Sequence, residues 1–225
     1  MRNDLRQSSR GTDAYRIISS LFCVSVVLSN IVSAKMVRIA LFRDLTVPAG
    51  LIIYPITFFI SDLVTEVYGV KNAKKMIYHA FGMSIFAYLI IEVVIILPSA
   101  NGYDQRRFEE VLGLNGILLF ASLTAYLCSQ ILDVRLYALI KNRTGRDRLL
   151  WLRNNGSTLI AQIVDTVIVD TIYLQCGVGL ELAEILPIMT FSYAYKCTCS
   201  VFLTPIFYIF YYIAKKKLIV LEYIE

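Results

Sequence analysis

The sequence predicts an all-α integral membrane protein, a bundle of six transmembrane helices. Hydrophobic residues make up 57% of its 225 residues and its mean hydropathy is +0.64, values that a water-soluble domain of ordinary composition does not reach. Six apolar segments have about the twenty residues that a helix needs to cross a bilayer. A barrel would instead require strands of about ten residues that alternate polar with apolar side chains. We therefore predict one transmembrane domain over residues 1–225.

The six predicted helices cover most of the chain. Their expected ranges are 15–36, 47–68, 76–97, 117–140, 157–176 and 185–214. The first is retained, because its apolar part is too long for a typical signal peptide and contains Asn30. In the second, Pro55 should kink or interrupt the helix, because proline removes a backbone donor and clashes with the preceding turn. Pro205 could do the same in the sixth.

The positions of Lys and Arg indicate the orientation in the membrane. They concentrate at 2–16, 71–75, 141–153 and 215–217, which share the side of the N-terminus if six helices cross. Cytoplasmic loops carry an excess of Lys and Arg, so we predict that both termini are cytoplasmic. The net charge of +5 then reflects topology and the anionic lipid bilayer. It does not indicate direct nucleic-acid binding, which needs a basic face with interleaved aromatic residues on a soluble surface.

Several catalytic and cofactor chemistries are disfavoured. His79 is the only histidine, and the five cysteines match no zinc or thioredoxin-type spacing, so we expect no metal site and no cofactor. The sequence has no H-E-x-x-H or G-x-S-x-G motif, which argues against an intramembrane enzyme. It also lacks a Walker A sequence, so it should hydrolyse no ATP unaided.

Acidic residues inside the predicted spans are the most informative feature of the chain. They are Asp62, Glu66, Glu92, Asp133, Asp165 and Asp170. Each costs roughly 2.5–3.5 kcal/mol near the middle of a membrane helix. The bases inside the predicted spans are Arg135 and Lys196, with Lys35 at an edge. The surplus carboxyl groups should therefore be protonated, hydrated in a cavity, or ready to bind a cationic or hydrogen-bond-donating ligand.

These acids recur at helical spacings. Asp62 and Glu66 lie one turn apart on the same helix face. The fourth and fifth segments each carry a Gln-x-x-Asp pair, in "SQILDV" and "AQIVDT". Counted from the predicted helix ends, Asp62 should lie about 9 Å deep and Asp133 and Asp165 about 12 Å deep. We therefore expect all three around one common chamber, although such polar stripes can also join helices by hydrogen bonds.

Three motifs in order carry a resemblance to a known family. They are "TFFISDLVTEVYG" followed by "VKNAKK", then "CSQILDV", then "LLWLRNNGSTLIAQIVDTVI". Together they resemble the queuosine precursor transporter family, the YhhQ type of the vitamin uptake transporter group. The resemblance implies a multi-pass carrier in the bacterial inner membrane. Its substrates would be 7-deazaguanine bases such as preQ0, preQ1 or queuine, taken up for salvage into modified tRNA.

The resemblance also implies a set of substrate-binding or coupling residues. These are Asp62, Glu66, Gln130, Asp133, Arg153, Asn155, Ser157, Gln162 and Asp165. We expect Asp165 with Gln162 to recognise the base, and Asp62 with Glu66 to serve proton coupling or gating. Residues 153–158 should form a turn before the fifth helix that could close the cytoplasmic mouth, and residues 69–75 a basic turn. Tyr54 and Phe58 are the nearest stacking candidates.

Other interpretations stay open at this point. The chain could be the substrate-binding membrane subunit of an energy-coupling-factor type uptake system for a vitamin or nucleobase, which depends on a separate ATP-driven module. A scaffold role would leave the buried carboxylates without an explanation. Which deazapurine is carried, whether protons or another ion drive its uptake, and which carboxylate binds or couples are left open by the sequence, as is the oligomeric state.

Overall fold

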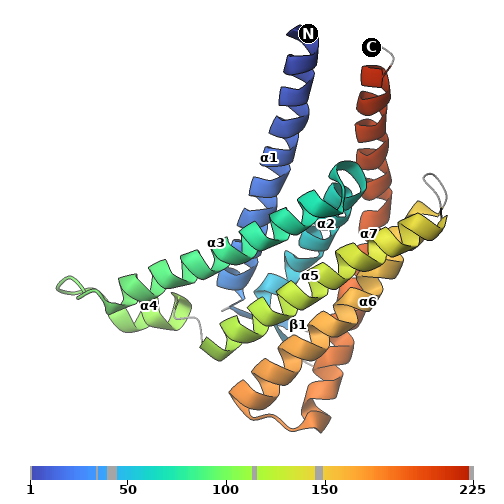
Figure 1. Cartoon of the computed structure of the whole chain (residues 1–225). Coiled ribbons are helices and arrows are strands. Elements are labelled where there is room, and N and C mark those ends of the chain that lie inside the picture. Colours follow the sequence, from blue (N-terminus) through green and yellow to red (C-terminus); the bar gives the residue numbers. More distant parts are fainter. Residues whose placement is uncertain (1, 34, 40–44, 113–115, 145–148, 223–225) are drawn as a thin grey trace.

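A computed structural model describes residues 2–33, 35–39, 45–112, 116–144 and 149–222 of the chain. Over these residues, six helices are long and apolar enough to cross a membrane, which confirms the predicted all-α six-span bundle. Figure 1 shows that α1 (Arg2–Val32) begins and α7 (Leu182–Glu222) ends at the same end of the bundle. We call this the terminal end and the other the distal end. The side chains of 2–12, 145–148 and 214–222 lie outside the described part.

The remaining elements connect these two helices in chain order. They are β1 (Met36–Ile39), β2 (Leu45–Pro48), the 3-10 helix η1 (Ala49–Ile52), α2 (Tyr54–Tyr68), α3 (Val70–Ile96), α4 (Gln105–Leu112), α5 (Gly116–Thr144), α6 (Leu150–Asp170) and the π-helix η2 (Thr171–Val178). The two strands pair antiparallel, with Met36 opposite Pro48, and they lie just beyond the end of α1 that points away from the termini (Figure 1).

The start of the second span differs from the prediction. Residues 47–52 form the end of β2 and η1, and α2 begins at Tyr54. Pro55 therefore lies in the first turn of α2, where its missing N–H would have no intrahelical partner in any case. The span is thus interrupted between η1 and α2 directly before Pro55, one of the two predicted outcomes, and the proline helps to start α2 and does not kink it.

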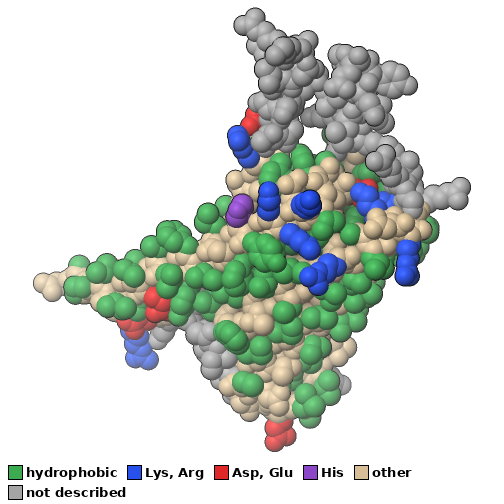
Figure 2. Space-filling view, viewed as in Figure 1, with side chains coloured by type: hydrophobic (Ala, Val, Ile, Leu, Met, Phe, Trp, Pro, Cys, Tyr) green, Lys and Arg blue, Asp and Glu red, His purple; other side chains and the backbone are tan. Residues whose placement is uncertain are grey.

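The junction between α2 and α3 is a single residue. Gly69 has a φ of 82°, and α3 begins at Val70, so the predicted basic turn over 69–75 is wrong. Lys71, Lys74 and Lys75 instead lie in the first turns of α3. Lys and Arg side chains gather toward the terminal end of the molecule (Figure 2).

The start of α6 is the largest departure from the prediction. The helix begins at Leu150, after Leu149 with a φ of 60°, so residues 153–158 are helical and do not form a turn. These polar residues are buried, because other helices supply partners for them. At about 1.5 Å per residue, Asp165 then lies about 22 Å from the start of its helix, and not the expected 12 Å.

Helix α2 lies at the centre of the bundle. It contacts α1, α3, α5, α6 and α7, and half of its span is buried. Apolar packing secures the terminal half, where Phe22 of α1, Val64 of α2 and Met76 of α3 are fully buried. Large apolar side chains such as Phe86 and Phe202 are exposed, and the hydrophobic surface in Figure 2 fits contact with lipid. The central α2 is therefore the helix best placed to carry polar groups away from lipid.

Candidate functional site

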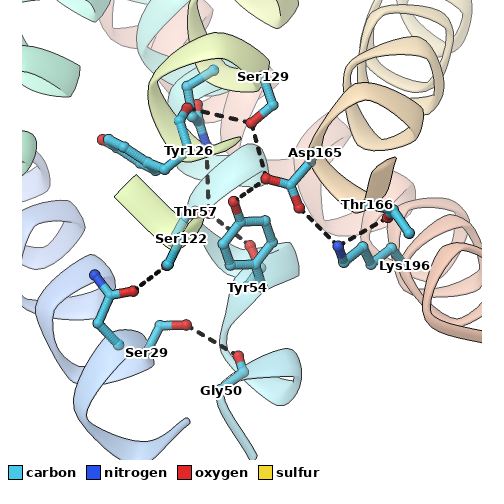
Figure 3. Close-up of polar contacts among 12 residues, drawn as sticks. Ser29, Gly50, Tyr54, Thr57, Ser122, Tyr126, Ser129, Asp165, Thr166 and Lys196 are labelled. Atoms are coloured by element: carbon cyan, nitrogen blue, oxygen red, sulfur yellow. Dashed lines mark hydrogen bonds and ion pairs between the residues drawn. The ribbon is translucent and has the colours of Figure 1, made fainter. Parts of the chain in front are cut away.

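The first polar centre surrounds Asp165 in the distal half of the bundle. Its Oδ1 accepts hydrogen bonds from the Tyr54 hydroxyl and from Ser129 Oγ at 3.2 Å, and its Oδ2 accepts from Lys196 Nζ at 2.8 Å. Lys196 also donates to Thr166 Oγ1 at 3.1 Å. Figure 3 shows these side chains converging on Asp165 from α2, α5, α6 and α7. Asp165 is 1% exposed, so four helices meet at one buried ion pair.

A pocket of about 90 Å³ opens beside this centre. It holds space for several water molecules, each of which needs only about 10–15 Å³ by this kind of measure. The polar lining comes from Ser29, Asn30, Ser33, Tyr54, Ser122, Asp165, Asp170, Ser192 and Lys196. Ser29 Oγ donates to the Gly50 carbonyl at 3.1 Å, and a side chain at Gly50 would collide with Ser29 and Ser33. The close approach of η1 to α1 thus defines one wall.

Sequence reasoning did not assign Lys196 or Asp170 to the site. The signal for Lys196 was its rarity, because a lysine in an apolar span needs an acidic partner or a route to water. Its Nζ also lies 5.1 Å from the centroid of the Tyr54 ring, within the range of a cation–π contact. Tyr54 was considered for stacking, and the structure also gives it a hydrogen bond to Asp165.

The second polar centre contains Asp62 of α2 and Asp133 of α5. The charges of these two carboxyl groups act on each other. Thr158 Oγ1 donates to Asp62 Oδ2 at 3.1 Å and Ser61 Oγ to Asp133 Oδ2 at 3.5 Å. Two ionised carboxylates that act on each other repel, which suits the pair to holding one proton between them.

Unpartnered polar atoms surround this carboxyl pair. Among the described residues, no hydrogen-bond partner is found for either side-chain polar atom of Gln162 or for Asn154 Oδ1, all of which are buried. Asp62, Asn154 and Gln162 line a hollow of only about 10 Å³. A buried unsatisfied polar group costs about 1–3 kcal/mol, so each of these side chains needs an explanation beyond packing.

Two amides of the predicted site have other partners. Gln130 Nε2 donates to Thr57 Oγ1 at 3.4 Å, which places Gln130 between the two centres. Asn155 donates to Thr204 Oγ1 at 2.8 Å and accepts from Ser200 Oγ at 3.1 Å. Asn155 therefore joins α6 to α7 and takes no part in either carboxylate centre.

The third polar centre lies at the terminal end of α2. Glu66 accepts hydrogen bonds from Arg153 at 3.3 and 3.4 Å and from the Tyr137 hydroxyl at 2.9 Å, and it pairs with Lys141 at 3.0 Å. Arg153 is fully buried and also donates to Thr144 Oγ1 at 3.2 Å. Salt bridges from Glu66 therefore connect α2 to both α5 and α6 at this end.

The structure does not place the predicted site residues around one chamber. Asp62 and Asp133 come together as expected, but Asp165 lies in a separate centre farther from the terminal end. The expectation that Asp62, Asp133 and Asp165 lie at similar distances from their helix ends was wrong, because it treated residues 153–158 as a loop before the helix that carries Asp165. The described part of the chain contains a series of three centres, around Glu66, around Asp62 and Asp133, and around Asp165.

Buried ionisable centres stacked through a six-helix bundle, with a polar pocket at one of them, define the class of small multi-pass membrane transporters. Residues 48–210 match the family model described as "Putative vitamin uptake transporter". The chain therefore belongs to the vitamin uptake transporter family, as its motifs predicted.

Two relatives are similar over different shares of the chain. A Bacillus subtilis (strain 168) protein named "Probable queuosine precursor transporter" is 32% identical over 78% of this chain and 74% of its own length. A Haemophilus influenzae protein of the same name is 22% identical over 53% of this chain and 48% of its own length. No solved structure matches the chain.

Proposed function

We propose that this chain imports queuosine precursors, 7-deazaguanine bases such as preQ0, preQ1 or queuine, across the bacterial inner membrane for tRNA modification salvage. The family and the names of two relatives support this substrate class. The structural observation that carries it is Asp165, a buried carboxylate with a cationic partner at the wall of a polar pocket.

The chemistry of Asp165 suits one edge of a 7-deazaguanine. The ring N1–H and the exocyclic amine present two adjacent donors, and a carboxylate can accept both in the two-pronged manner in which it binds a guanidinium. The Tyr54 ring beside the carboxylate offers an aromatic surface for the flat base. Asp165 with Tyr54 is therefore our candidate for base recognition. Gln162, originally expected to join them, lines the inner hollow and is assigned to the path that the base follows next.

The positions of the centres support an alternating-access cycle. The pocket beside Asp165 contains residues of η1, on the distal side, while charges around Glu66 join three helices at the terminal end. With cytoplasmic termini, this arrangement faces outward and is closed toward the cytoplasm by the Glu66 centre. Arg153 thus contributes to closure of the cytoplasmic mouth from within a helix and not from a loop.

We assign proton coupling to Asp62 with Asp133. Asp62→Asn and Asp133→Asn should each abolish accumulation of substrate driven by an inward proton gradient, because the pair could no longer load and release a proton. Exchange of labelled for unlabelled substrate should continue. Vesicle accumulation and counterflow assays measure the two processes, with Glu92→Gln on α3 as a carboxyl control outside the three centres. Loss of exchange in parallel with accumulation would argue for a structural role.

Reconstitution of the purified chain tests the proposed function directly. In vesicles without ATP, it should take up a radiolabelled 7-deazaguanine, and an excess of unlabelled base should compete. This follows because the chain has its own buried ionisable path and no ATP-binding motif. Uptake that appears only when ATPase subunits are added would instead identify an energy-coupling-factor type subunit, and no uptake or binding of any 7-deazaguanine would refute the substrate assignment.

A further inference from the structure

Lys196 is held where a substrate would have to bind. Its Nζ donates a hydrogen bond to Asp165 Oδ2 at 2.8 Å, while Tyr54 and Ser129 already donate to Oδ1. A planar pair of N–H donors needs a lone pair on each carboxylate oxygen. With Lys196 in its present position, the donor edge of a base would face an ammonium group that can only donate. Binding at Asp165 therefore requires Lys196 to leave Oδ2 and either Tyr54 or Ser129 to release Oδ1.

Asp170 offers an acceptor at the same pocket. It is 9% exposed and lines the pocket with Asp165 and Lys196, and its Oδ2 has no hydrogen-bond partner among the residues that the structure describes. Its charge interacts with those of Lys196 and Asp165. The α-helix ends at Asp170 and the π-helix η2 follows directly, a type of irregularity that is frequent at functional sites.

Helical geometry places Asp170 within the range of a small lysine movement. Thr166, the second hydrogen-bond partner of Lys196, precedes Asp170 by four residues, so the two lie on the same face of α6 about 6 Å apart along its axis. Lysine has a flexible four-carbon stem and three rotatable donors. Asp165 itself is five residues from Asp170 and does not share this face, but both carboxyl groups line the pocket with Lys196, so the ammonium can pass from one to the other through the pocket.

We propose that Lys196 is a movable cation that substrate displaces from Asp165 onto Asp170. The inference rests on the proposed function, because it needs a solute with two adjacent N–H donors. Asp170 is then a positioning residue, which sets affinity by holding Lys196 away from Asp165. The exchange gives Lys196 a carboxylate partner both before and after binding, so the empty site is closed to solutes that cannot replace the ammonium on Asp165.

A double-mutant cycle tests this proposal. The dissociation constant of 7-aminomethyl-7-deazaguanine is measured by calorimetry on the full chain in lipid nanodiscs, for the natural protein, Asp170→Asn, Lys196→Met and the double variant. With Lys196 present, Asp170→Asn should weaken binding by about tenfold or more, because the binding-competent position of the lysine becomes rare. In the Lys196→Met background, the same change should alter binding by less than about threefold, since nothing remains to be displaced.

Infrared difference spectroscopy adds a measurement that would not change if Asp170 had only a structural role. Addition of the base should change a carboxylate band that is absent from the difference spectrum of Asp170→Asn. Equal losses of affinity in both lysine backgrounds, or no loss with Lys196 present, would overturn the proposal while leaving the proposed function intact. A natural protein that binds no 7-deazaguanine would overturn both.

Discussion

Replacing Asp165 by Asn is expected to lower uptake of a 7-deazaguanine by about a hundredfold or more. Two charge-assisted hydrogen bonds to the base would be lost, each worth about 1.5–3 kcal/mol, and every 1.4 kcal/mol is a factor of ten. The measurement is queuosine in tRNA of cells that cannot make its precursor and that receive the base in the medium. Full uptake by Asp165→Asn at normal expression would contradict the assignment of base recognition.

Folding must be separated from recognition in this experiment. Asp165→Asn removes the charge partner of buried Lys196, and loss of one member of such a pair can cost several kcal/mol. The double variant Asp165→Asn/Lys196→Met replaces the pair by neutral side chains and should therefore reach the membrane at the normal level. We expect it to remain inactive, whereas Glu92→Gln, a carboxyl change on α3, should retain uptake.

Replacing Glu66 by Gln is expected to produce the largest loss of stability. The change removes the carboxylate between Arg153 and Lys141, and breaking a buried pair costs about 3–5 kcal/mol. For a chain of this size the melting temperature should fall by about 6–20 °C. It is measured in detergent by the intrinsic fluorescence of tryptophan and tyrosine during heating. Asp13→Asn is the matched control, because its partner Arg16 is 73% exposed and a surface pair is worth at most about 1 kcal/mol.

The same change should open the cytoplasmic mouth. In a background without the native cysteines, Gln162→Cys reports access to the inner hollow through reaction with a membrane-impermeant thiol reagent. The reagent should label this cysteine from the cytoplasmic side much faster in Glu66→Gln than in the parent. Unchanged labelling together with an unchanged melting temperature would show that the Glu66 centre does not hold this end closed.

Local patterns in the sequence were sufficient to predict the spans and most of the acids at the site. Hydropathy is a property of each segment alone, so six helices and the burial of Asp62 and Asp165 followed without knowledge of their neighbours. The family motifs cover α2, α5 and α6, the helices that contribute the predicted site residues. The comparisons with known proteins agree with the family that these motifs indicated.

Contacts between distant residues could not be predicted in the same way. Residues 153–158 look like a loop because Arg, Asn and Ser interrupt the apolar pattern, yet Glu66 and Thr204 supply partners from other helices, and α6 starts earlier as a result. The acceptor of Lys196 lies 31 residues away in the sequence. The packing of the helices decides which carboxylate Lys196 pairs with, and the spacing of residues in the sequence does not predict that partner.

Helix α2 carries one member of each polar centre, Tyr54, Asp62 and Glu66, along about 18 Å of a single rod. A rod that tilts about its middle must move its two ends in opposite directions. When the end of α2 that carries Glu66 moves outward, the end that carries Tyr54 therefore moves inward, and the opposite tilt has the opposite effect. Simultaneous opening of the bundle at both ends is thus disfavoured by the rigidity of α2.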